Sequence, residues 1–392
     1  MSTPGSETSI GKLLENSTAV YGEKKAIHFD HENIAFSYKE LNERVNRFAN
    51  VLQSHGVRQG DHVAVMLPNC PEFPITWLAL AKLGAVMVPL NVRYQVADLE
   101  YTLNDCDASA IVIAPDFAAV FSEARTNTPD VQIVFSVGAG DLKESLDIST
   151  LAEQASPEFL SRDLTPHDVI NIQYTSGTTG FPKGCILTHE YWLTIGKTVA
   201  EYMGEDDVFL SVSPFYYMDP QWELISCLMV GATLVISRSY SPSAYMDLVR
   251  KHKATISWAT MAPWILKQPP AKLDRQHHLR FVLVGGFPPD LHRQFEQRFN
   301  VIAREAYGMT EIGPGMFVPP EDDHMTGSGS VGIPFESRQV SIRDDQGREI
   351  PRGEIGELWI RGRGMFKGYY NKPKETAEAF SGDWLKTGDL FR

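Results

Sequence analysis

The chain has 392 residues, 43% hydrophobic and 22% charged, a composition typical of a globular protein large enough for more than one core. Its formal net charge of −13 excludes a broad nucleic-acid-binding surface, because affinity for a phosphate backbone needs clustered Lys and Arg. The four cysteines form no C-x-x-C pair, and neither a secretory signal pattern nor a run of transmembrane length occurs. We therefore expect a cytoplasmic protein with reduced thiols and no membrane span.

The first half of the chain alternates helical and strand-like segments. Residues 10–21 predict a short helix, and Ser37 with Glu40 forms a capping box for a second helix that ends near Gly56. The other segments are strands at 26–29, 34–36, 62–67, 85–89, 110–114 and 133–136, and helices at 73–82 and 96–104. This alternation indicates a parallel sheet covered by helices.

The second half begins with another alternating series and ends in a β-rich region. The predicted strands of the series are 208–212, 233–237, 255–258, 281–284 and 301–305. From Ser330 onward, short β-prone runs at 338–343 and 357–361 are broken by turns. We expect paired α/β subdomains over 10–318 and a smaller β-rich subdomain over 319–392.

The most informative stretch is Y-T-S-G-T-T-G-F-P-K-G, residues 174–184. It predicts a loop that joins a strand at 169–174 to a helix at 186–198. Glycines let main-chain N–H groups approach a ligand, the hydroxyls donate further hydrogen bonds, and Lys183 adds a positive charge, so a polyphosphate is the expected ligand. A cluster of this composition can also be a solvated loop. It is not a Walker A loop, because Pro182 precedes the lysine and Gly184 follows it.

Two further turn motifs follow predicted strands, and a third follows Trp384. Gly285-Gly286-Phe287 follows the strand at 281–284, Y-G-M-T-E at 307–311 follows the strand at 301–305, and K-T-G-D occupies 386–389. Each alone can be a tight turn. Together they predict a nucleotide site beyond the carboxyl ends of parallel strands, with glycines against a flat ligand and a carboxylate for Mg²⁺.

These motifs, with G-E-L-W-I-R-G between the last two, stand in an order and spacing that resemble the adenylate-forming superfamily. That superfamily contains acyl- and aryl-CoA synthetases, peptide-synthetase adenylation domains and firefly luciferase. The resemblance runs from about residue 10 to the last residue. It implies an α/β fold with two flavodoxin-like parallel-sheet subdomains and a small distorted β-barrel.

By motif position, the resemblance implies four catalytic residues, Thr175, Lys183, Thr310 and Glu311, with Glu311 as the Mg²⁺ ligand. It implies that Tyr307 stacks on adenine and that Asp389 binds the ribose. The full set implied to hold ATP is Thr175, Ser176, Gly177, Thr178, Thr179, Gly180, Lys183, Gly285, Gly286, Glu305, Ala306, Tyr307, Gly308, Thr310 and Asp389.

The implied reaction joins a small carboxylic acid to the α-phosphorus of ATP, releases pyrophosphate and then transfers the acyl group to coenzyme A. Because two anions must meet, charge neutralisation by Lys183 and Mg²⁺ is the main requirement. Family members continue beyond the position of Asp389 into a small C-terminal domain, and this chain ends at Arg392. We therefore expect a chain without the C-terminal catalytic domain, with slow adenylation and little thioester formation, and a homodimer is possible.

An aromatic region supplies candidates for the acyl pocket, which are Tyr216, Tyr217, Asp219, Trp222, Trp258, Phe287, Gly308 and Met309. Tyr216 or Tyr217 stands where the family often has a gating histidine. The alternative is that these rings are ordinary core residues. Residues 216–221 and 231–233 also resemble the carnitine and crotonobetaine CoA ligase branch, where rings and a carboxylate would hold a trimethylammonium group through cation–π contacts of roughly 0.5–2 kcal/mol. An aromatic, fatty or polycyclic acid fits the same lining.

Two other functions stay open at the level of sequence. The acyl group could pass to a carrier protein, as in an acyl-AMP ligase or a peptide-synthetase loading domain. Alternatively, the chain could be a non-catalytic protein that binds a nucleotide or an acyl-adenylate. A Mg²⁺ ligand beside a phosphate loop favours an enzyme, since a simple binder does not need one.

Overall fold

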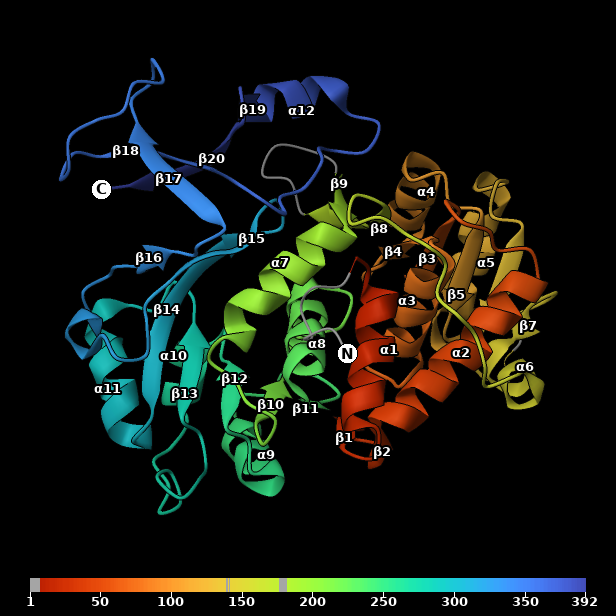
Figure 1. The fold of residues 1–392 in the computed structure, drawn as a ribbon, viewed down its shortest axis with the longest axis horizontal. Coiled ribbons are helices and arrows are strands. Elements are labelled where there is room, and N and C mark those ends of the chain that lie inside the picture. The colour runs from red at the N-terminus through yellow and green to blue at the C-terminus, as the bar shows by residue number, and fades with distance from the viewer. Residues whose placement is uncertain (1–7, 139, 141, 176–181) are drawn as a thin grey trace.

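The computed structural model describes residues 8–138, 140, 142–175 and 182–392. Two α/β lobes lie side by side, and a smaller β-rich unit at the end of the chain lies beside them (Figure 1). The expected fold class is confirmed, and the β-rich unit is an antiparallel half-barrel. Within the described residues, no helix is both long and apolar enough to cross a membrane.

The first sheet is built from the first half of the chain and is parallel except for its last strand. In spatial order its described strands are β7 (Leu146–Asp147), β6 (Ile133–Ser136), β5 (Ala110–Ile113), β3 (His62–Met66), β4 (Val86–Pro89), β8 (Val169–Thr175) and β9 (Lys183–Thr188). β4 and β5 are buried along their whole length, as expected for parallel strands covered on both faces. β9 runs antiparallel to β8 at the sheet edge.

The second sheet has a parallel centre and an antiparallel pairing at each end. In spatial order its described strands are β16 (Ile333–Pro334), β15 (Gly313–Phe317), β14 (Ile302–Met309), β13 (Phe281–Val284), β12 (Ile256–Trp258), β10 (Val208–Ser211), β11 (Thr233–Ile236), β1 (Lys25–Phe29) and β2 (Ile34–Ser37). The hairpin β1–β2 comes from the start of the chain, and Ile27 pairs with Leu234 of β11. The two lobes therefore share the chain's N-terminal elements.

A layer of helices packs between the two sheets, and one hydrophobic core spans this layer and both of them. Its helices are α1 (Ile10–Tyr21), α2 (Tyr38–Ser54), α3 (Glu72–Leu83), α7 (His189–Ala200) and α8 (Met218–Val230). The capping box predicted at Ser37 and Glu40 is present at the start of α2. Trp77 of α3 and Trp192 of α7 meet edge to face, with ring centroids 5.2 Å apart.

Other helices cover the outer faces. α4 (Val96–Asp105), η1 (Pro115–Phe117), α5 (Ala118–Ala124) and η2 (Arg125–Asn127) belong to the first lobe, where α6 (Ile148–Gln154) packs on α2. α9 (Tyr245–His252), α10 (Ala262–Leu266) and α11 (Pro289–Phe299) cover the second sheet, and η3 (Asp323–Met325) follows. The half-barrel pairs β17 (Arg338–Arg343), β18 (Gly356–Gly362), β20 (Trp384–Phe391) and β19 (Phe380–Ser381), with α12 (Pro373–Ala379) beside it.

Three predicted segments differ from the structure. The segment after the 174–184 stretch begins as strand β9, not as a helix, because residues 183–188 pair antiparallel with β8, and α7 starts only at His189. Tyr307-Gly308-Met309 does not follow a strand but forms the end of β14, where it pairs with β15. Residues 386–389 likewise lie within β20, which pairs with β18 through a register shift. In each case antiparallel pairing extends the strand, with the neighbouring strand of a hairpin for residues 183–188 and 307–309 and with β18 for residues 386–389.

Candidate active site

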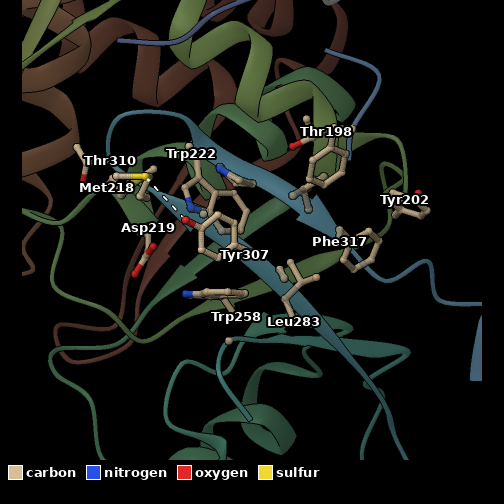
Figure 2. A pocket seen from close by; sticks show the side chains of 18 of the residues that line it. Thr198, Tyr202, Met218, Asp219, Trp222, Trp258, Leu283, Tyr307, Thr310 and Phe317 are labelled. Atoms are coloured by element: carbon tan, nitrogen blue, oxygen red, sulfur yellow. Dashed lines mark hydrogen bonds between the residues drawn. The ribbon is translucent and has the colours of Figure 1, made fainter. Parts of the chain in front are cut away.

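A cavity of about 360 Å³ opens at the carboxyl ends of β12, β13 and β14, against α7 and α8. Figure 2 shows the rings of Trp222, Trp258 and Tyr307 around this space, with the Asp219 carboxylate toward one end and Tyr202 and Phe317 toward the other. The predicted site residues that line it are Asp219, Trp222, Trp258, Gly285, Gly286, Ala306, Tyr307, Gly308, Met309 and Thr310. The structure therefore places nucleotide candidates and acyl candidates around one space.

The turn after β13 forms the glycine-lined wall of the cavity. Gly286 has a φ of +60°, and a Cβ built on it would meet no atom within 4 Å, so the main chain is open to a ligand. The main-chain N–H of Phe287 donates to Glu305 Oε1 at 2.7 Å, which fixes the turn to β14. Glu305 Oε2 is buried without a hydrogen-bond partner, and burial raises the pKa of this carboxyl to about 7.

Asp219 supplies the charge at the aromatic end. It lies on the first turn of α8, and Ser213 Oγ donates to its Oδ2 at 3.4 Å. Burial raises the pKa of Asp219 to about 6, although the side chains of Trp222, Ser213 and Trp258 favour its ionised form. At neutral pH this cavity thus combines aromatic faces with a carboxylate, which is a combination that attracts a cation.

Lys183 and Glu311 meet at a third side chain, Tyr369. Glu311 is 6% exposed, and Tyr369 donates its hydroxyl to Glu311 Oε1 at 2.7 Å. Lys183 Nζ lies 4.4 Å from the centroid of the same ring. Thr175 pairs with Lys183 across the β8–β9 ladder. Ser176, Gly177, Thr178, Thr179 and Gly180 lie outside the described residues.

Tyr307 and Asp389 also lie together. The Tyr307 hydroxyl donates to Asp389 Oδ2 at 2.6 Å, and its ring packs against Phe391 with centroids 5.0 Å apart. Burial and the neighbouring carboxylate raise the pKa of Tyr307. The end of β20 is thereby attached to the wall of the cavity.

Residues 14–370 match the sequence profile of the AMP-binding enzyme family. The chain belongs to this family. Crotonobetaine/carnitine–CoA ligases from Salmonella paratyphi B and Salmonella typhimurium are 36% identical to it, and each alignment covers 97% of this chain and 77% of the relative. The nucleotide motifs and this match agree on a ligase of the acyl- and aryl-CoA synthetase group.

Solved structures give the same result for the fold of this AMP-binding enzyme. The N-terminal domain of FACL13 from Mycobacterium tuberculosis superposes with a TM-score of 0.88 at 26% identity, covering 98% of this chain and 97% of that chain. An ATP-bound RpMatB-BxBclM chimera superposes with a TM-score of 0.86 at 27% identity, covering 97% of this chain and 76% of that chain.

Three aromatic candidates of the AMP-binding enzyme do not line the cavity. Phe287 is buried in the core under α11, where its ring contacts Phe295 with centroids 5.5 Å apart. Tyr216 is buried, and its carbonyl accepts a hydrogen bond from Gln173 Nε2 at 2.8 Å, while Tyr217 is 47% exposed. None of these three rings is among the described residues that line this cavity, and their assignment to the acyl pocket stays a prediction.

Several residues at the cavity were not among the candidates from the sequence. Thr198, Tyr202, Met218, Phe317 and Phe335 line the cavity, and Tyr191 donates its hydroxyl to the Thr310 carbonyl at 2.8 Å. Tyr369 was also missed. The available signal was Gly368-Tyr369-Tyr370, a glycine beside two rings shortly after the G-E-L-W-I-R-G motif.

Proposed function

We propose that this AMP-binding enzyme uses ATP and Mg²⁺ to activate a small carboxylic acid as an acyl-adenylate with release of pyrophosphate, and then transfers the acyl group to coenzyme A. The observation that carries the proposal is the single cavity shared by the glycine turn, Tyr307 and Thr310 on one side and by the aromatic residues of α8 and β12 on the other. An acid bound among those rings would meet a nucleotide bound at the turn. The ATP-bound relative of the same fold supports this arrangement.

The described residues fit a nucleotide. The open main chain at Gly286 allows close approach of a flat base, and the buried Glu305 Oε2 needs a donor such as an adenine amino group. Lys183 would bind phosphate oxygens. The position of Asp389 beside Tyr307 suits a carboxylate that accepts ribose hydroxyls.

Glu311 fits a magnesium ion that is bound mainly by phosphates. Only one of its oxygens, Oε1, accepts a hydrogen bond from a described residue, which leaves Oε2 for a metal. Mg²⁺ commonly uses one or two carboxylates together with substrate phosphates and water. When bound, it would neutralise phosphate charge, and Lys183 would share that task.

For the acid, we propose a carboxylate that carries a cationic group at its other end. The cavity offers two indole rings, two phenol rings and the Asp219 carboxylate, and the relatives at 36% identity are named crotonobetaine/carnitine–CoA ligases. Cation–π contacts and one carboxylate together distinguish a trimethylammonium group from a neutral chain of the same size.

A pyrophosphate-release assay tests both statements. Purified protein with ATP, Mg²⁺ and L-carnitine, benzoate or octanoate should release pyrophosphate, fastest with L-carnitine. Glu311→Gln should lower this rate about 10²-fold or more, because charge stabilisation in phosphoryl transfer is lost. Coenzyme A and a pantetheinylated carrier protein, supplied separately, identify the acceptor. No pyrophosphate with any acid would contradict the activity, and a preference for octanoate would contradict only the substrate class.

A further inference from the structure

Tyr369 stands between two charged side chains that would otherwise attract each other. Its hydroxyl donates to Glu311 Oε1 at 2.7 Å, and Lys183 Nζ lies 4.4 Å above its ring. Tyr369 is 9% exposed and Glu311 is 6% exposed, so water screens this region poorly. Among the ion pairs of the described residues, none joins Lys183 to Glu311.

A direct pair between Lys183 and Glu311 would work against the proposed function. The half-buried Lys183 and the buried Glu311 would neutralise each other in direct contact, and breaking that pair would leave an uncompensated buried charge. The lysine would then no longer be available to bind the phosphates, and the carboxylate would no longer be available to bind the metal. Tyr369 instead gives each charge a weaker partner, a ring face for the ammonium and a hydroxyl for the carboxylate.

The hydroxyl is available as a donor at neutral pH. A phenol hydroxyl is a hydrogen-bond donor at neutral pH, and the 2.7 Å contact places it on Glu311 Oε1. Its oxygen thus presents a hydrogen to Glu311 and not a second negative charge. The contact orients the carboxylate without neutralising it.

The chain around Tyr369 is fixed to both segments that carry the charges. The N–H of Tyr370 donates to the Gly184 carbonyl at 2.8 Å, and the N–H of Phe366 donates to the Glu311 carbonyl at 2.9 Å. The N–H of Tyr369 itself donates to Thr376 Oγ1 at 2.9 Å. The ring is therefore held in place by main-chain contacts that do not depend on Lys183 or on the Glu311 side chain.

We propose that Tyr369 is a positioning residue that keeps Lys183 and Glu311 apart, so that both remain available to ATP and Mg²⁺. The proposal rests on the proposed function of these two residues. It assigns to the ring the role of a spacer and to the hydroxyl the role of orienting the metal ligand.

Calorimetric titration of the purified chain with ATP, without Mg²⁺ and at a series of Mg²⁺ concentrations up to saturation, tests the two roles separately. Tyr369→Phe keeps the ring, so its affinity for ATP without Mg²⁺ should stay within twofold of wild type, while the Mg²⁺ concentration needed for tight binding should rise several-fold. Tyr369→Leu removes the spacer and should weaken ATP binding about tenfold in both conditions. Tyr370→Leu is the matched control, because the hydroxyl of Tyr370 contacts Asp107 instead.

A second substitution shows whether the two charges pair once the ring is gone. Glu311→Gln removes a negative charge near the phosphates and should strengthen Mg²⁺-free binding modestly in the wild-type chain. In the Tyr369→Leu chain, the gain in Mg²⁺-free ATP affinity should be several-fold larger, since Glu311→Gln there also releases Lys183 from its pair with the glutamate. If Tyr369→Leu only removes packing, Glu311→Gln should raise the ATP affinity equally in both backgrounds.

Each outcome bears on a stated claim. Equal gains from Glu311→Gln in both backgrounds, or a Tyr370→Leu effect as large as that of Tyr369→Leu, overturn the spacer role. Unchanged Mg²⁺ dependence in Tyr369→Phe overturns the orienting role. A wild-type chain that binds no ATP overturns the proposed function, and the inference with it, whereas intact wild-type binding with unaffected variants overturns the inference alone.

Discussion

At the scale of single residues, Asp219 decides what the cavity attracts. It alone carries a carboxylate among the described residues that line this space. Burial raises its pKa to about 6, which means that the side chain is ionised at pH 7 and becomes protonated below pH 6. The charge of the aromatic end of the cavity therefore changes within an experimentally convenient pH range.

We predict that the affinity for a cationic acid falls as the pH drops from 7.5 to 5.5. The sign follows from the raised pKa, because protonation removes the charge that attracts the cation, while a bound cation itself favours the ionised form. Asp219→Asn should lose about 1–2 kcal/mol of binding to L-carnitine and most of this pH dependence. The measurement is KM for L-carnitine across this pH range, with octanoate as the neutral control. If wild type and Asp219→Asn show the same pH dependence of KM for L-carnitine, the role of Asp219 is refuted.

The sequence was informative about single residues where order along the chain carries the information. Lys183, Thr310, Glu311 and Asp389 were candidates from motif order, and the structure brings Lys183 and Glu311 to one side chain, Tyr369. Tyr369 could not be found in this way. Its partners Glu311 and Lys183 lie 58 and 186 residues earlier in the chain, and only folding brings them together.

At the scale of elements, the segment 366–370 fastens the half-barrel to the first sheet. Lys367 and Gly368 exchange main-chain hydrogen bonds with Ile186 of β9 at 2.9 and 3.0 Å. Gly368 has a φ of +127°, and a Cβ built on it would lie 2.6 Å from Thr376 Cγ2. This position therefore excludes a side chain on two independent grounds.

We predict that Gly368→Ala lowers the free energy of unfolding by about 1–3 kcal/mol and weakens ATP binding, because the shifted segment carries Tyr369. Urea unfolding and ATP titration measure the two effects. Gly353→Ala is the matched control, since Gly353 has a φ of +94° but no atom within 4 Å of its built Cβ. If Gly368→Ala and Gly353→Ala both bind ATP as tightly as wild type, the docking of segment 366–370 does not position the ATP site.

Element prediction succeeded where local signals are strong. The capping box at Ser37 and Glu40 gave the start of α2, and the apolar runs gave β3 to β6 within a residue or two. The prediction failed at residues 183–188, 307–309 and 386–389. These residues are strands because they pair antiparallel with β8, β15 and β18, respectively. Pairing between two strands leaves little trace in the local propensity of either one.

At the scale of the whole molecule, the helix layer between the two sheets joins both lobes. α7 and α8 approach so closely that a Cβ built on Gly196 would lie 2.4 Å from Ile225 Cγ2. A buried polar chain also crosses the layer, with Trp77 Nε1 donating to Asn171 Oδ1 at 2.8 Å and Asn171 Nδ2 donating to Gln221 Oε1 at 3.0 Å. Both lobes should consequently unfold together.

We predict that Gly196→Ala lowers the free energy of unfolding by about 1–3 kcal/mol, with one transition seen by circular dichroism and by tryptophan fluorescence. The sign is diagnostic, because the same change in an exposed helix would add about 1 kcal/mol of stability. Lys197→Ala, at an exposed position of α7, is the control. A stabilised Gly196→Ala chain, or two separate transitions, would show that the layer is not tightly shared.

The structure of the chain with ATP, Mg²⁺ and L-carnitine tests the central claim most directly. The account predicts the base against Gly285-Gly286 and Tyr307, the phosphates at Lys183, the metal on Glu311 and the acid among Trp222, Trp258 and Asp219. A nucleotide seated outside this cavity, or phosphates that touch neither Lys183 nor a metal held by Glu311, would contradict it.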